Sequence, residues 1–168
     1  MGFDVNVTGI SEKITFLETF DKDVAKTLKK EMRAGANEVA KVSRSLLPST
    51  PLSNWGPWTF SRDGRDLGYQ GSRVKSRVTV ETYRSRMSGV TVAFGYRVGN
   101  WSPAGSVYEL AGSINESGEK FNSLINSRHG AIQPKQPRTL IPAYYKAMPT
   151  AQARIEAAIE AAARKASD

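Results

Sequence analysis

The sequence predicts an α+β fold in which a long N-terminal helix and a C-terminal helix pack on one face of a small antiparallel sheet. Three observations predict it: a helical apolar period over 17–47, strand-like alternation over 73–83 and 90–98, and an alanine-rich helical pattern near the C-terminus. A chain of 168 residues fits one compact domain, and we see no internal repeat. We therefore expect residues 1–168 to form a single domain.

The N-terminal part contains a weak pattern followed by a strong one. Residues 1–16 alternate weakly between apolar and polar types, which predicts a short strand or an ordered arm. Over 17–47 apolar residues recur at three- and four-residue steps, which predicts a long amphipathic helix. Gly35 is expected to be its weak point or kink, because glycine costs about 1 kcal/mol relative to alanine in a helix. Pro48 ends the helix.

Residues 48–72 form a loop rich in proline, glycine and serine that nevertheless contains several aromatic residues. Loops of this length are usually functional or disordered, and a disordered linker is poor in aromatic residues. The loop is therefore expected to dock, either on its own domain core or on a neighbouring subunit. Large aromatic side chains dominate binding hot spots, so the expected partner contacts are Trp55, Trp58, Phe60 and, outside the loop, Trp101.

Alternation over 73–83 and 90–98, with a turn at 84–89 between them, predicts an antiparallel hairpin. Basic side chains on one face of a strand lie about 7 Å apart, which suits a phosphate backbone without reading bases. An acidic protein surface is the other partner that such a row fits. The residues concerned are Arg73, Lys75 and Arg77 on the first strand and Arg84 and Arg86 in the turn.

The C-terminal third contains one short element, a second long loop and a helix. Residues 105–111 are expected to be extended or helical, and 112–138 to be a mobile loop with few large apolar groups. A helix is expected to begin near Pro142 and to be kinked or restarted at Pro149. Its apolar stripe is mostly alanine, which permits close packing against another helix.

The charge of the chain is unevenly distributed around a net value of +8. Residues 1–23 carry two basic and five acidic groups, 24–86 carry thirteen and five, and 87–168 carry nine and six. A local basic excess indicates either a polyanionic or acidic partner or a solvated face. No segment approaches the roughly 20 apolar residues of a membrane span, and the N-terminus does not resemble a signal peptide. A soluble protein without membrane contact is expected.

Catalytic patterns are lacking in the sequence. There is no cysteine and only one histidine, His129, which argues against disulfides, thiol catalysis and histidine-based metal sites. No phosphate-binding glycine motif is present, and Glu116 and Glu119 lie in a polar segment that would not desolvate them. We therefore expect no enzymatic activity, no cofactor and no metal.

Three short segments occur in a characteristic order along the chain. They are Leu46-Leu47-Pro48 followed by Ser53-Asn54-Trp55-Gly56, Val107-Tyr108-Glu109-Leu110-Ala111-Gly112-Ser113, and Arg138-Thr139-Leu140-Ile141-Pro142-Ala143-Tyr144. In order and spacing they resemble the tail-completion (neck) proteins of long-tailed bacteriophages, including the minor tail protein Z-like group. The chain departs from that family at 48–72, where many relatives have a short turn and this sequence has a tryptophan-rich insertion.

The resemblance implies a structural virion protein, made in the host cytoplasm and located where the phage head joins the tail. It implies a homo-hexameric ring next to head-closure, tail-terminator or tail-tube proteins, with non-specific contact to packaged DNA. Within the matching segments, Tyr108, Glu109 and Arg138 become expected inter-subunit or partner contacts, with Glu109 and Arg138 as an ion pair. Two alternatives stay open: a tail-terminator ring protein and a basic, non-specific nucleic-acid-binding module.

Overall fold

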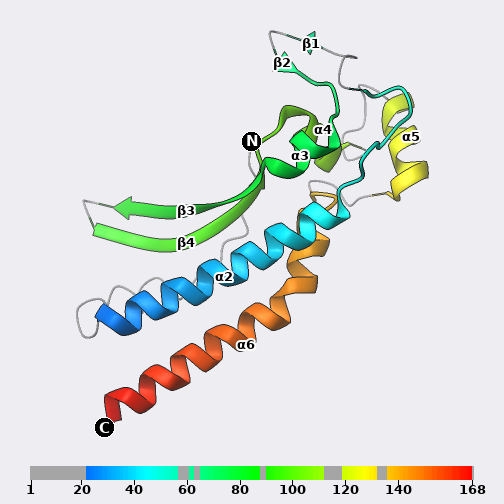
Figure 1. Ribbon diagram of the computed structural model, residues 1–168. Helices are drawn as coiled ribbons and strands as arrows, with labels where there is room; N and C mark the ends of the chain where they lie inside the picture. Colours follow the sequence, from blue (N-terminus) through cyan, green and yellow to red (C-terminus); the bar gives the residue numbers. More distant parts are fainter. Residues whose placement is uncertain are drawn as a thin grey trace.

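A computed structural model describes residues 22–56, 61–62, 65–87, 90–111, 119–131 and 136–167 (Figure 1). The expected arm at 1–16 lies outside these residues, as do Trp58 and Phe60. In chain order the elements are α2 (Lys22–Leu46), β1 (Ser61–Arg62), β2 (Arg65–Asp66), α3 (Gly71–Ser76), β3 (Val78–Met87), β4 (Val90–Asn100), α4 (Pro103–Leu110), α5 (Glu119–His129) and α6 (Leu140–Ser167).

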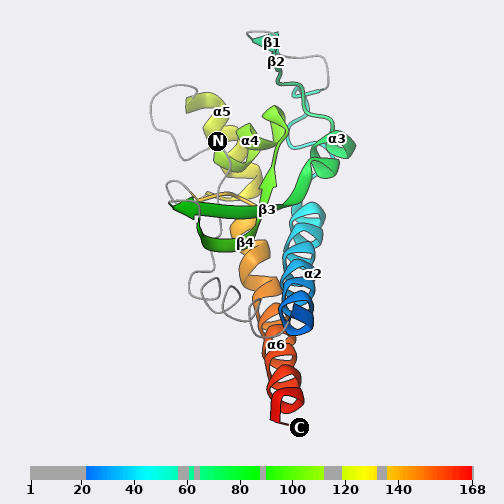
Figure 2. The ribbon, with the colours of Figure 1, turned by 90° about the vertical axis from the view of Figure 1, so that its left-hand side faces the viewer.

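Helix α2 is the centre of an elongated α+β molecule, which confirms the predicted fold class. It packs against α6 on one side and against the antiparallel β3–β4 ribbon on the other. Helices α2 and α6 lie side by side and antiparallel in both ribbon views (Figures 1 and 2). Leu28 and Met32 of α2 illustrate the layering, because they pack with Tyr96 of β4 and Ile155 of α6.

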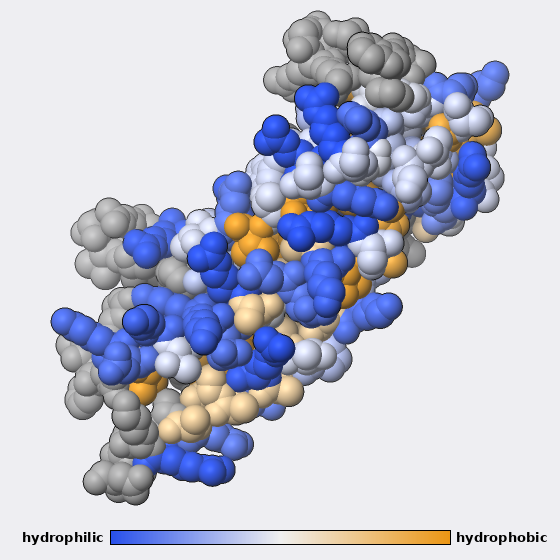
Figure 3. Space-filling view, in the orientation of Figure 1, coloured by the Kyte–Doolittle hydropathy of each residue, from blue (hydrophilic) through white to orange (hydrophobic). Residues whose placement is uncertain are grey.

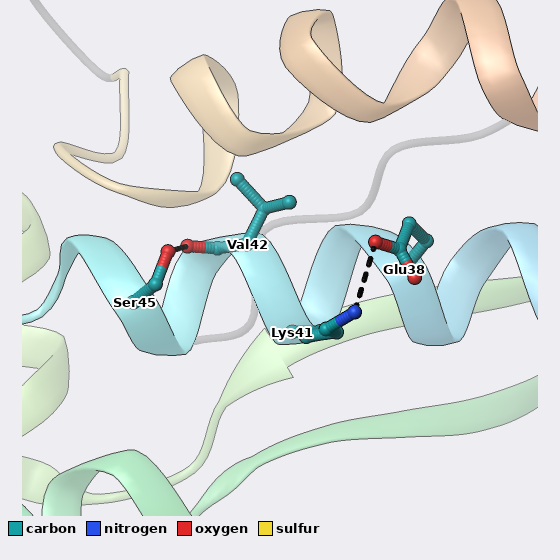
Figure 4. Close-up of polar contacts among 4 residues, drawn as sticks. All are labelled: Glu38, Lys41, Val42 and Ser45. Atoms are coloured by element: carbon teal, nitrogen blue, oxygen red, sulfur yellow. Dashed lines mark hydrogen bonds and ion pairs between the residues drawn. The ribbon is translucent and has the colours of Figure 1, made fainter.

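Packing, more than surface pairing, holds α2 in place. Its buried positions recur with the helical period expected from the sequence: Ala25, Leu28, Met32, Gly35, Val39, Ala40 and Ser43. On the opposite face the Lys41 ammonium lies 3.5 Å from the Glu38 carboxylate, and the Ser45 hydroxyl donates to the Val42 carbonyl at 2.7 Å (Figure 4). Exposed pairs of this kind contribute less than about 1 kcal/mol.

Gly35 has a different role from the one expected. Helix α2 continues through it without a break. A Cβ atom at position 35 would lie 2.9 Å from the Cβ of Ala151, which is closer than side chains approach. Gly35 is therefore a point of close approach between α2 and α6 within a continuous helix.

The predicted hairpin is present as β3 and β4, but its first strand starts later than expected. The register runs from Val78 opposite Asn100 to Met87 opposite Val90, with an irregularity between Ser85 and Arg86. The side chain of Arg44, in the last turn of α2, donates to the Val78 carbonyl at 2.6 and 3.1 Å and fixes the start of β3.

Residues 71–76 form the short helix α3 where a strand was predicted. Arg73 and Lys75 therefore lie on a helix and Arg77 is its C-cap, so the expected row on one strand face is wrong. The alternation there was between basic and small residues, and only Val74 is buried, at 1% exposure. An alternation of polar residues buries little apolar surface, so it does not stabilise a strand over a helix in residues 71–76.

The second predicted loop, 112–138, contains helix α5, and this expectation is also wrong. Only Ile125 is fully buried on α5, at 0% exposure, so the helix has a weak apolar period. The helical alternative for 105–111 is confirmed by α4, whose N-cap Ser102 accepts a hydrogen bond from the Gly105 N–H at 3.0 Å.

Helix α6 contains Pro149 and changes direction in its N-terminal part, as the predicted kink requires (Figure 1). Beyond the proline its outer face is rich in exposed alanine, which Figure 3 shows as a pale band on a mostly hydrophilic face. Among the helices in the described ranges, none is long and apolar enough to cross a membrane.

Candidate functional site

Two of the three segments singled out in the sequence, 107–113 and 138–144, meet at the N-terminus of α6. The Arg138 N–H donates to the Glu109 carbonyl at 3.0 Å. The Glu109 carboxylate, at the end of α4, accepts the Thr139 N–H at 2.7 Å and the Thr139 hydroxyl. The Ser43 hydroxyl of α2 lies 2.9 Å from the Thr139 hydroxyl. The segment 138–140 is thus held by side chains of α2 and α4.

Glu109 is a buried carboxyl group with 3% exposure. Burial raises its pKa above the ordinary value of 4.5, and hydrogen bonds from Thr139 and Leu140 and the charge of Arg138 oppose that rise. The backbone N–H groups at a helix N-terminus favour a negative charge. Glu109, which belongs to α4, therefore caps the N-terminus of α6. The residues next to Glu109 in the sequence did not indicate this role.

The Arg138 guanidinium points mainly at backbone carbonyls and does not form the expected ion pair with Glu109. Its Nη2 donates to the Ala111 carbonyl at 2.6 Å and to the Asn126 side-chain oxygen at 3.0 Å. Its Nη1 donates to the Gly130 carbonyl. One side chain thereby joins the end of α4, helix α5 and the start of α6.

An aromatic cluster surrounds this network. Trp55 is 3% exposed, donates from Nε1 to the Leu67 carbonyl at 2.8 Å, and packs on Tyr69 and Phe121 with ring centroids 5.1 Å away in each case. The Tyr108 ring lies 5.9 Å from that of Tyr69, and the Arg138 guanidinium lies 5.7 Å from the Tyr108 ring centroid. Burial raises the pKa of Tyr108 to about 12, so its hydroxyl is neutral at physiological pH.

This burial corrects the expected roles of four residues. The loop docks on its own core through Trp55, which was one of the two alternatives. Trp55, Tyr108, Glu109 and Arg138 all have exposures of 8% or less, so they offer almost no surface to another subunit. These four residues therefore stabilise the fold of a single copy.

A basic–aromatic surface lies where α3 meets the end of β4, and we define it by Arg73, Arg77, Arg97 and Trp101. The backbone N–H of Trp101 donates to the Arg77 carbonyl at 3.0 Å, which joins the residue after β4 to the end of α3. Trp101 is 36% exposed and Arg97 lies 5.1 Å from its ring centroid. Arg73 and Arg77 are also exposed, four residues apart on the helix and its C-cap.

The geometry around Trp101 is built by two neighbours. A Cβ at Gly99 would come within 3.1 Å of the indole, so glycine lets the ring lie against strand β4. Arg97 is held by Glu81, its cross-strand neighbour, through contacts of 3.0 and 3.2 Å. Sequence reasoning missed Arg97, because residues four apart on an extended strand lie about 13 Å apart and the contact with Trp101 depends on the course of the chain after β4.

The other predicted basic residues lie farther along the ribbon. Arg84 is exposed on β3, about 23 Å from Arg77 along an extended strand. Lys75 is half-buried on α3. The side chain of Arg86 lies outside the described residues. The five basic residues therefore do not form one continuous row.

In the part of the chain that the structure describes, no group of three or more histidine, cysteine, aspartate or glutamate residues could hold a metal ion. Comparisons with protein-family models, curated proteins and solved structures find no match to this chain. The buried network and the basic–aromatic surface are therefore the observations that support a functional proposal.

Proposed function

We propose that the chain is a structural protein of the neck or tail end of a long-tailed bacteriophage, and that it forms a ring that completes the tail and joins it to the head. The observation that carries the proposal is the contact between segments 107–113 and 138–144, two of the three on which the resemblance to that family is based. Glu109 from one and Thr139 from the other interlock at the start of α6, within the helix–hairpin–helix order of that family.

The distribution of exposed groups supports this proposal. Exposed arginines on α3 and β3 suit weak, sequence-independent contact with DNA that has to slide past. The ends of the elongated molecule differ, because α3, α4 and α5 gather at one end and the first turns of α2 lie at the other (Figures 1 and 2). Contacts between unlike surfaces of identical copies generate rings when the rotation closes.

The test is a deletion of this gene in the phage genome that carries it, followed by electron microscopy of the lysate. We expect filled heads and finished tails that remain separate, and infectious particles after the protein is supplied from a plasmid. Overlong tails would assign the tail-terminator role instead. Normal infectious particles would overturn the proposal and favour a nucleic-acid-binding module.

A further inference from the structure

The outer edge of strand β3 is the side of the strand that faces away from β4. Within the residues that the structure describes, β3 pairs with β4 and with no other strand (Figure 1). We propose that this edge pairs with the same edge of a second copy, antiparallel and about a two-fold axis. The inference goes beyond the proposed neck function, because it concerns the free protein and does not depend on a role in the virion.

Two hydrogen bonds at the base of the ribbon establish which backbone groups of β3 point outwards. The Trp101 N–H donates to the Arg77 carbonyl at 3.0 Å, and these two residues continue the register of the β3–β4 pair. Bonded and non-bonded pairs alternate along an antiparallel ladder, so the even-numbered residues of β3 direct their N–H and C=O groups away from β4. The Val78 carbonyl agrees with this, because it accepts hydrogen bonds from the Arg44 side chain of α2 at 2.6 and 3.1 Å.

The open part of the edge is bounded at both ends. At the base, Arg44 occupies the Val78 carbonyl and α3 directly precedes the strand. Toward the tip, the ladder is irregular between Ser85 and Arg86. Three outward-facing residues lie between these ends, of which the first is half-buried and the other two are exposed: Val80, Thr82 and Arg84. Residues 79–85 contain no proline or lysine, which commonly protect the edge strands of natural proteins.

The outer edge of β4 is covered by its own copy, so it does not offer the same kind of partner. Val98 and Asn100 are each only 6% exposed. The Asn100 carbonyl accepts a hydrogen bond from the Ser106 hydroxyl of α4 at 3.2 Å, and Tyr96 packs on α2. The edge of a second copy that matches the open β3 edge is therefore the β3 edge itself.

The bounds of the open stretch also determine the register. When residues 79–85 pair with themselves in antiparallel, the overlap is greatest with Thr82 opposite Thr82 of the second copy. Val80 then lies opposite Arg84, and all three outward-facing residues form hydrogen-bonded pairs. Threonine opposite threonine is a favourable cross-strand pair. Centring the pair on Glu81 or on Arg84 would place like charges directly opposite, which is destabilising.

The pairing converts the two-stranded ribbon into a four-stranded antiparallel sheet. A two-stranded ribbon has little stability of its own, and additional strands stabilise it. The contact joins identical patches, so it is complete with two copies and does not continue into a filament. Because the stretch is short, the interface is small, and we expect a dimer that dissociates on dilution.

The first test replaces the residue at the centre of the contact and uses sedimentation velocity at protein concentrations of tens to hundreds of micromolar. The wild-type chain should reach a monomer–dimer equilibrium. Thr82→Pro should weaken dimerisation by about tenfold or more, because it removes an outward N–H that the β3–β4 ladder does not use. Thr82→Ala, which keeps that N–H, is the matched control and should still form the dimer.

The second test uses the two-fold axis and does not depend on whether the proline variant folds. Thr82→Lys and Thr82→Glu should each dimerise more weakly than the wild type, because each places two like charges opposite one another. A mixture of the two variants should dimerise more strongly than either variant alone, since a lysine then faces a glutamate.

Four results would overturn the inference. They are a wild-type chain that stays monomeric, a proline variant that is folded by circular dichroism and dimerises normally, a mixture that associates no better than its components, and association that continues beyond a dimer. The last result would assign the edge to a contact between unlike sites. None of these results affects the gene-deletion experiment, so the failure of this inference and the failure of the proposed function are distinguishable.

Discussion

At the scale of single residues, Glu109 and Arg138 show how buried polar groups organise this fold. Glu109 binds the first N–H groups of α6, and Arg138 binds carbonyls at the ends of α4 and α5. A buried polar group without a partner costs about 1–3 kcal/mol, so each of these groups stabilises one specific arrangement of three helices. Both residues were singled out in the sequence, but the partners of both were found only in the structure.

We predict that Glu109 makes stability depend on pH. Its folded pKa is raised above 4.5 by burial, so the native state binds the proton more tightly than the unfolded chain does. Between 4.5 and that raised pKa, ionisation therefore lowers the free energy of unfolding as pH rises. Glu109→Gln cannot ionise, so the stability advantage of the wild type over this variant should shrink across that window. Urea unfolding at a series of pH values measures the difference.

A constant difference across the same pH window would contradict this assignment. Arg138 is the charged group that acts on the carboxylate. Glu156→Gln, at an exposed site on α6, is the matched control and should show no comparable pH dependence.

We predict that Arg138→Met destabilises the fold by about 1–3 kcal/mol, because the buried carbonyl of Ala111 and the carbonyl of Gly130 lose their donor. Helix α5 should lose hydrogen-exchange protection before α2 does, since Arg138 bonds the Asn126 side chain within α5. Arg154→Met removes an exposed arginine of α6 and should change stability by less than about 0.5 kcal/mol. Equal losses in the two variants would show that the Arg138 network does not stabilise the fold.

At the scale of elements, the contact between α2 and α6 depends on small residues. Gly35 and Ala151 bring the two helices together where larger side chains would separate them. The alanine-rich pattern of the C-terminal helix correctly predicted close packing against another helix. It did not predict which residue of the first helix would meet it.

We predict that Gly35→Ala destabilises the protein although alanine favours helix. The helical preference contributes about 1 kcal/mol, but the added Cβ would lie 2.9 Å from that of Ala151, and overpacking costs about 1–3 kcal/mol. Ala151→Gly in the same chain should relieve the contact, giving a coupling energy of about 1 kcal/mol or more in a double-mutant cycle. Thermal unfolding of the four proteins measures it. Additive effects would mean that the helices do not touch at this point.

At the scale of the whole molecule, the net charge of +8 is spread over separate surfaces. Arg73 and Arg77, on α3 and its C-cap, lie well apart from Arg84, which is farther along strand β3. A single copy can therefore place only a few cationic groups on one stretch of DNA at a time. A ring that lets DNA pass needs contacts of this weak kind.

We predict that the isolated chain binds a 30-base-pair duplex with a Kd of about 10⁻⁵ M or weaker at 150 mM salt, within the range of non-specific binding. Sequence changes in the duplex should not alter the affinity. Fluorescence anisotropy over a salt series measures both. Nanomolar binding with a slope that decreases in Arg77→Gln would contradict the ring proposal and favour a basic nucleic-acid-binding module.

The sequence by itself determined the α+β class, the long amphipathic helix, the hairpin and the C-terminal helix. Each of these has an apolar period that its own burial explains. Prediction from the sequence failed at α3 and α5. Each of these helices has one fully buried apolar residue, Val74 in α3 and Ile125 in α5, and one residue gives no periodic pattern. Their conformation depends on contacts with distant segments, which no window of the sequence contains.

Only the tertiary structure decided what the singled-out residues do. It placed Trp55, Tyr108, Glu109 and Arg138 inside the fold, and it brought the Arg97 guanidinium against the Trp101 ring. Aromatic and charged residue types are equally suited to a buried network and to an exposed contact. Which of the two applies depends on long-range packing, because the free energy of a polar group is set by the partners that the fold brings to it.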